Sequence, residues 1–167
     1  MTTVACSYVG AFQDSSGYGD AARQDVAALH LAGVDVTTET AVHMKEKTHH
    51  GWQGELTYAL QDRDIPYKVR ILHLTPDMYD SYLEKDIYHI GRLFWETDRL
   101  PKDWAKHCNR MGEIWTSSAN MIELFKRSGV KVPMYAFPEP IDVTMGDKDF
   151  GKYGVPGHEG YLFYSMF

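Results

Sequence analysis

The sequence is poor in cysteine and has no long hydrophobic run. Its two cysteines, Cys6 and Cys108, match no metal-binding spacing. Because both lie in segments expected to be structured, we expect buried free thiols in a reducing cytoplasm. No apolar run approaches the roughly 18 residues of a membrane-spanning helix. No basic segment precedes the first apolar stretch, as it would in a signal peptide. The sequence therefore predicts a cytoplasmic protein without a membrane span.

Positive charge is also scarce. The 167 residues include 17 Lys and Arg against 23 Asp and Glu, so the formal net charge is -6. Because nucleic-acid binding requires a basic face, we expect no nucleic-acid partner. The acidic residues are spread along the chain and form no acidic tail. Hydrophobic residues make up 44% of the chain, which is enough for one domain with a substantial core.

Short strand-like runs alternate with helical patterns along the chain. Strands are expected at 3–9, 34–40, 67–74, 87–95, 113–116 and 132–137, and helices at 18–32, 55–61, 102–110 and 119–128. Ser16 and Ser118 are suitable N-cap residues, and Gly33 is a typical helix stop. This alternation predicts an α/β domain of the Rossmann-like three-layer type, with a mostly parallel sheet covered by helices on both faces.

The C-terminal region has a different composition. Residues 142–160 are rich in Gly, Asp and Lys and indicate a linker. The run YLFYSMF at 161–167 has the character of a strand. A strand with nothing after it is an unusual way to finish an α/β domain. We therefore expect a first domain over residues 1–141, followed by the opening strand of a second domain that is otherwise absent.

Three segments carry a family resemblance. They are the turn SGYG (16–19) followed by AAR (21–23), the stretch GRLFWETDRLPKDW (91–104), and EIWTSSANMIELFKRSGVKVP (113–133) with PEPID (138–142). In this order and spacing the chain resembles the N-terminal half of a retaining glycosyltransferase of the GT-B fold, in the glycosyltransferase family 4-like group. The resemblance covers nearly the whole chain. It implies an acceptor-side domain that faces a C-terminal, donor-binding domain, of which only residues 161–167 would be present.

The resemblance implies transfer of a sugar from a nucleotide-sugar donor to a hydroxyl of a glycan or other acceptor, with retention at the anomeric carbon. It implies no cofactor and no bound metal, and it implies that this chain alone is inactive. One alternative is a non-catalytic, stand-alone Rossmann-like module that binds a sugar or nucleotide and docks to a separate chain. A nicotinamide-dependent oxidoreductase is less favoured, because the chain lacks the G-x-G-x-x-G spacing.

The opening turn is the first candidate site. Ser16, Gly17, Tyr18 and Gly19 lie beyond the first expected strand, where ligands of parallel sheets gather. Glycine allows close approach of the backbone, and a helix N-terminus favours an anion. The resemblance implies contact with the donor phosphates or with the acceptor. The alternative is a packing turn before a well-capped helix.

Further candidates follow the third and fourth expected strands. His73 could donate to or accept from a sugar hydroxyl or a phosphate, or bond a loop carbonyl instead. Trp95 and Thr97 flank Glu96, which is the catalytic candidate because a carboxylate in a dry cleft can take the proton of an acceptor hydroxyl. Relatives often have a histidine near this point, which this chain lacks. A salt bridge with Arg92 or Arg99 is the structural alternative for Glu96.

The remaining candidates are less specific. Ser117 could reach the cleft, whereas Ser118 is explained by its role as a helix cap. Glu139, between two prolines, could reach across the cleft or remain solvated. The histidines at 43, 49 and 50 have no fixed ligand spacing, so a loop beside the acceptor is favoured over a metal site. Three aromatic residues near that loop, Trp52, Tyr58 and Tyr67, could stack on a sugar or belong to the core.

Overall fold

A six-stranded parallel sheet organises the computed structural model, which describes residues 4–41 and 51–140. The strands are β1 (Ala5–Gly10), β2 (Asp35–Thr40), β3 (Val69–His73), β4 (Tyr88–Arg92), β5 (Glu113–Thr116) and β6 (Met134–Ala136). The helices are α1 (Gly17–Leu31), α2 (Gly51–Ala59), the 3-10 helix η1 (Pro76–Tyr82), α3 (Trp104–Cys108) and α4 (Ala119–Arg127). All strand pairs are parallel, and the spatial order is β2-β1-β3-β4-β5-β6. The predicted Rossmann-like α/β architecture is confirmed.

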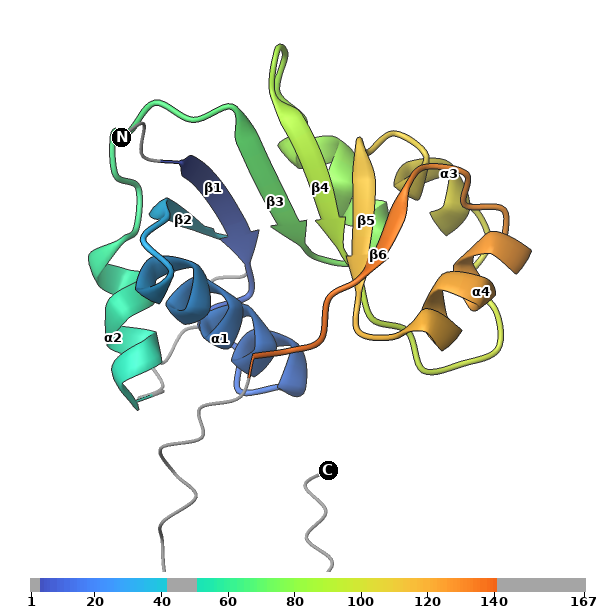
Figure 1. Cartoon of the computed structure of the whole chain (residues 1–167), viewed down its shortest axis with the longest axis horizontal. Coiled ribbons are helices and arrows are strands. Elements are labelled where there is room, and N and C mark those ends of the chain that lie inside the picture. Colours follow the sequence, from blue (N-terminus) through green and yellow to red (C-terminus); the bar gives the residue numbers. More distant parts are fainter. Residues whose placement is uncertain (1–3, 42–50, 141–167) are drawn as a thin grey trace, which may run out of the picture.

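Two hydrophobic clusters cover the two faces of the sheet, whose strands and helices are drawn in Figure 1. On one face, Tyr8 of β1 and Ile71 of β3 pack against Val26 of α1, and α2 adds to the same cluster. On the other, Leu72 of β3 packs with residues of η1, α3 and α4, of which Phe125 is fully buried. Successive side chains of a strand point to opposite faces, which explains why neighbours such as Ile71 and Leu72 serve different clusters.

The sheet has a topological switch point between β1 and β3. The chain passes from β1 to β2 on one side of the sheet and then returns to β3 on the other side of β1. In open α/β sheets, ligands bind beyond the carboxyl ends of the strands at such a point, and we call this region the crevice. These ends point downward in Figure 1, toward the start of α1. The crevice region is therefore bordered by the turn before α1 and by His73, the last residue of β3.

The local end signals around α1 are confirmed. Ser16 is the N-cap, and its side chain accepts a hydrogen bond from the Gly19 N–H. Gly33 has a φ of +84°, the left-handed conformation that ends a helix at little cost for glycine. Ser118 caps α4 in the same manner, by accepting from the Met121 N–H.

Several predicted boundaries need correction. β4 ends at Arg92, so the predicted continuation of the strand to Trp95 is wrong. α2 begins at Gly51, before the predicted start, and α3 is shorter than predicted. The 3-10 helix η1 was not predicted; it begins at Pro76, whose fixed φ suits the first helical position.

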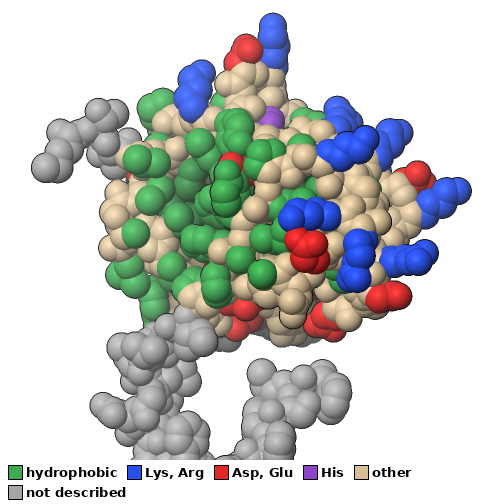
Figure 2. All heavy atoms as spheres, turned by 45° about the vertical axis from the view of Figure 1, so that its right-hand side comes forward, with side chains coloured by type: hydrophobic (Ala, Val, Ile, Leu, Met, Phe, Trp, Pro, Cys, Tyr) green, Lys and Arg blue, Asp and Glu red, His purple; other side chains and the backbone are tan. Residues whose placement is uncertain are grey.

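The predicted helical cover of both faces is incomplete over β4–β6. Tyr88, Tyr135 and Phe137 are 46%, 53% and 41% exposed. They lie on the same face of the sheet as Trp115, which stacks on Phe137 with ring centroids 4.9 Å apart. Figure 2 shows hydrophobic side chains gathered on one side of the molecule and Lys and Arg side chains on the other. A broad apolar surface is consequently left open.

Candidate functional site

Aromatic side chains gather where β3 and β4 end. The ring of His73 lies 4.8 Å from that of Tyr18 and 5.3 Å from that of Phe94, measured between centroids. Tyr18 stands in the first turn of α1, and its hydroxyl accepts a hydrogen bond of 3.4 Å from the Phe94 N–H. Burial raises the pKa of Tyr18 to about 12, so this hydroxyl keeps its proton at neutral pH. Two predicted residues, Tyr18 and His73, are thus brought together at the switch point.

A buried chain of polar groups lies beneath these rings. Arg92, at the end of β4, donates from Nε to Asp25 Oδ2 at 2.8 Å and from Nη2 to Asp25 Oδ1 at 3.3 Å. The Tyr8 hydroxyl donates to Asp25 Oδ2 at 2.8 Å and lies 2.8 Å from His73 Nδ1. Arg92 also donates from Nη1 to the carbonyl of Phe137. These contacts connect α1 and three strands with the segment after β6. We call Arg92, Asp25, Tyr8 and His73 the buried relay.

Burial dominates the electrostatics of the relay. Desolvation, followed by the positive charge of Arg92, lowers the pKa of His73 to about 3, so the ring is neutral in the folded protein. Desolvation raises the pKa of Asp25, and the Arg92 guanidinium opposes that rise. The pKa of Tyr8 lies well above its ordinary value, because of burial and then the Asp25 charge. His73 Nε2 is buried and has no hydrogen-bond partner among the described residues.

The opening turn is held by its own contacts. Arg23, which is nearly fully buried, donates from Nη1 to the carbonyls of Phe12 at 2.9 Å and Asp14 at 2.8 Å. The Asp14 carboxylate accepts from the N–H and the hydroxyl of Ser16. A Cβ at position 19 would lie 2.3 Å from the Asp14 carbonyl oxygen. Close packing of the turn therefore explains Gly19 without a ligand.

Gly17 differs from Gly19 in its surroundings. A Cβ at position 17 would meet nothing within 4 Å, so packing does not demand glycine there. Gly17 and Ser16 are both exposed, so the rim of the turn faces solvent. The structure therefore places the four predicted residues of the turn together, two on the open rim and two against the protein.

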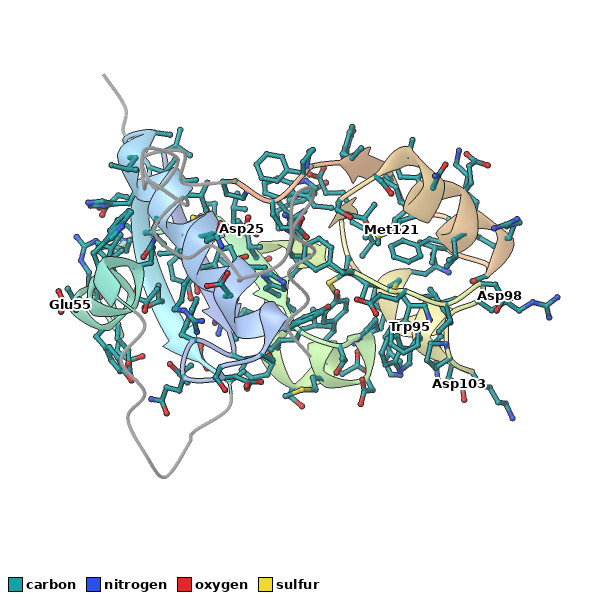
Figure 3. The ribbon with its side chains drawn as sticks, turned by 90° about the horizontal axis from the view of Figure 1, so that it is seen from below. Asp25, Glu55, Trp95, Asp98, Asp103 and Met121 are labelled. Carbon is teal, nitrogen blue, oxygen red and sulfur yellow. The ribbon has the colours of Figure 1, made fainter. Side chains whose placement is uncertain are left out.

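The loop after β4 lies apart from the relay. Trp95 Nε1 donates to Thr97 Oγ1 and to the Arg99 carbonyl, both at 2.7 Å, and the Trp95 ring meets the Trp104 ring at 4.7 Å. Figure 3, which looks onto the carboxyl ends of the strands, shows Trp95 beside α3 and far from Asp25 on α1. Glu96 is exposed on this loop. The suggested salt bridge between Glu96 and Arg92 is wrong, because Arg92 is fully buried against Asp25.

A hollow of about 540 Å³ borders the same loop. It is lined by Asp98, Arg99, Lys102, Asp103 and Arg127 together with several uncharged residues. Asp98 and Asp103 lie close to Trp95 in Figure 3. Because both signs of charge line the hollow, it shows no strong preference for an anion or a cation.

The last two predicted site residues, Ser117 and Glu139, differ in their surroundings. The Ser117 hydroxyl contacts Met121 Sδ at 3.3 Å, and its partial burial is accounted for by α4 packing. Glu139 is exposed, yet its negative charge contributes to the raised pKa of Asp25. Glu139 therefore lies close enough to the buried relay for their charges to interact.

Tyr8, Asp25, Arg92 and Phe94 were not predicted as site residues. The sequence carries a signal for two of them, because Arg92 interrupts the apolar strand IGRLF and Asp25 lies among the alanines and valine that face the core. A charged residue at such a position needs a buried partner. The predicted free thiols are confirmed: Cys6 and Cys108 are both buried and unpaired.

Within residues 4–41 and 51–140, no group of three His, Cys, Asp or Glu side chains is arranged to hold a metal ion. The histidines at 43, 49 and 50 lie outside the described residues, as do 142–160 and 161–167. Trp52, which follows the undescribed residues 42–50, is 45% exposed. The Tyr67 hydroxyl contacts the Glu84 carboxylate.

Comparison with known proteins leaves the family open. No protein-family model matches the chain, and no curated protein matches it. In the part of the chain that the structure describes, no helix combines the length and apolar character needed to cross a membrane.

Proposed function

We propose that this chain is the acceptor-side domain of a retaining glycosyltransferase, in which a separate domain holds the nucleotide-sugar donor. The observation that carries the proposal is the meeting of the turn at 16–19 with His73 at the switch point of an all-parallel sheet. Ligands of open α/β sheets bind at this place. The resemblance of segments 91–104 and 113–133 to GT-B glycosyltransferases supplies the chemical class.

The groups at the crevice suit a sugar hydroxyl. The Tyr18 ring offers an apolar face of the kind on which sugar rings stack, and its hydroxyl can both donate and accept. His73 adds a ring nitrogen without a partner. Serine hydroxyls and backbone groups of the turn are exposed beside them. Glu96 is no longer the best candidate for acceptor contact, because its loop diverges toward α3.

The open aromatic surface over β4–β6 fits a domain that has a partner. Tyr88, Tyr135 and Phe137 are large hydrophobic side chains that are each more than two fifths exposed on this surface, and exposed aromatic groups of this kind often mark an interaction site. Beside them, a hollow of about 240 Å³ is lined by Leu29, Trp115 and Phe137 and reaches Asp25. A second domain packed here would bury this surface, which favours the transferase domain over a self-sufficient binding module.

Chemical-shift mapping tests the proposal. The ¹⁵N-labelled chain would be titrated with a panel of neutral methyl hexopyranosides and, separately, with nucleotide sugars. We expect at least one glycoside to shift the amide signals of residues 16–19 and of His73, at millimolar concentration. The amide of Lys68 is the internal control, because Lys68 is exposed just before β3, at the amino ends of the strands and away from the crevice. We also expect no turnover of nucleotide sugar by this chain alone. Glycoside shifts confined to other surfaces, or sugar transfer by the isolated chain, would contradict the proposal.

A further inference from the structure

The hydrogen bonds of the buried relay fix where each proton lies. The Arg92 guanidinium, which can only donate, contacts both Asp25 oxygens, from Nε to Oδ2 and from Nη2 to Oδ1, so Asp25 is a carboxylate paired with Arg92. The Tyr8 hydroxyl, 2.8 Å from Oδ2, then has to donate to Asp25, because a carboxylate has no proton to give. The single proton of the Tyr8 hydroxyl is used in its bond to Asp25.

The Tyr8 oxygen can therefore only accept from His73. The Tyr8 oxygen and His73 Nδ1 are 2.8 Å apart, so His73 Nδ1 must carry a proton. The ring is neutral because it is fully buried beside Arg92. A neutral imidazole with a proton on Nδ1 has a lone pair on Nε2. This is the atom without a partner among the described residues.

The charged side chains around the crevice also favour a neutral ligand over an anion. Arg92 is bound to Asp25 and to the Phe137 carbonyl, while Arg23 is bound to carbonyls of the opening turn. Neither guanidinium is free to meet an anion. The carboxylate of Asp14 lies at the turn itself, where it repels a phosphate. A bare Nε2 likewise accepts from a donor and repels an anion.

We propose that Tyr8, Asp25 and Arg92 are positioning residues that hold His73 as the Nδ1–H tautomer, so that Nε2 accepts a hydrogen bond from a neutral hydroxyl of the ligand. This inference rests on the proposed function and narrows it: the crevice takes the hydroxyl acceptor and not the phosphates of the donor. Tyr18 and Phe94 cover the ring, and the Tyr18 side chain must rotate to admit the ligand.

Nitrogen NMR of ¹⁵N-histidine-labelled protein tests the relay without any ligand. We expect His73, assigned through a His73→Gln variant, to show a protonated Nδ1 and an unprotonated Nε2 at neutral pH. Tyr8→Phe removes the acceptor, and we expect the Nε2 signal to move toward its protonated position. Tyr79→Phe is the matched control, because Tyr79 is also fully buried but its hydroxyl has no partner among the described residues. A protonated Nε2 in the unaltered chain, or no change in Tyr8→Phe, overturns the inference.

The same signal reports the ligand class. Neutral methyl hexopyranosides should shift His73 Nε2, inorganic phosphate should not, and Tyr8→Phe should bind the glycoside about tenfold more weakly. A shift with phosphate overturns the inference. A glycoside that shifts the Tyr18 amide but leaves Nε2 unchanged overturns it while the proposed function stands. A panel that moves no crevice signal contradicts the proposed function, and the inference fails with it.

Discussion

Replacing Tyr8 by phenylalanine is the sharpest test of the buried relay. The change keeps the ring in its cluster and removes only the hydroxyl. That hydroxyl donates to the Asp25 carboxylate, a bond to a charged group worth about 1.5–3 kcal/mol. Its loss also leaves His73 Nδ1 buried without an acceptor, a further cost of about 1–3 kcal/mol. Because the two effects overlap at one atom, we expect a total loss of about 2–4 kcal/mol.

Urea unfolding followed by tryptophan fluorescence measures this loss. The comparison is Tyr79→Phe, which removes an equally buried hydroxyl that has no partner among the described residues. Since no hydrogen bond is lost there and a buried hydroxyl without a partner is removed, we expect the free energy of unfolding to stay the same or to rise by about 1–3 kcal/mol. The slope of the free energy of unfolding against urea concentration should be the same in the unaltered protein and in both variants. Equal midpoints for the Tyr8 and Tyr79 variants would refute the relay as a stabilising network.

Three further outcomes are expected. In urea unfolding, Asp25→Ala should lower the free energy of unfolding by about 3–5 kcal/mol, because it leaves the Arg92 charge buried without its partner. Adding Arg92→Met to this variant should restore part of the loss. If the losses of the two single variants simply add in the double variant, the pairing is contradicted. The pKa of His73 is lowered from 6.5 to about 3, so its contribution to the free energy of unfolding should be complete above pH 6.5 and should fall as the pH drops toward 3. Relative to His73→Gln, the fall should be about 1.4 kcal/mol per pH unit. Parallel pH profiles would exclude a buried neutral imidazole. In thermal melts, Gly19→Ala should lower the free energy of unfolding by about 1–3 kcal/mol, because the added methyl group overpacks the turn. Gly17→Ala should raise it by about 0.4–1 kcal/mol, because position 17 is open and alanine restricts the unfolded chain. Equal effects of the two changes would contradict the geometry of the turn.

Local signals explain why much of the fold could be predicted from the sequence. The bounds of β5 agree with the strand predicted at 113–116, and the caps at Ser16 and Ser118 follow from side-chain chemistry within three residues. Alternating strands and helices predicted the parallel sheet for the same reason, since each pattern is contained in a short window. The resemblance to a family of glycosyltransferases stays a prediction.

The end of β4 shows where local signals fail. Residues 93–95 continue the apolar run, yet the strand stops at Arg92 because Trp95 bonds Thr97 and the Arg99 carbonyl and packs on Trp104. These contacts form a turn that competes with the strand. The strand propensity of aromatic residues was therefore overridden by hydrogen bonds and by packing on α3.

The site itself depends on pairs that no local pattern specifies. Arg92 and Asp25 are 67 residues apart in the chain, and Tyr8 and His73 are 65 apart. The sequence could show that a charged side chain stood in an apolar strand, but not which helix would supply its counter-ion. His73 was predicted as a hydrogen-bonding residue, whereas its proton position depends on those distant partners.

The relay also joins the crevice to the segment that follows β6. Arg92 bonds the Phe137 carbonyl, and its guanidinium lies 5.2 Å from the centroid of the Phe137 ring. The Glu139 charge, two residues further on, acts on Asp25. Because Arg92 and Asp25 share one buried ion pair, a displacement of residues 137–139 changes the field at His73.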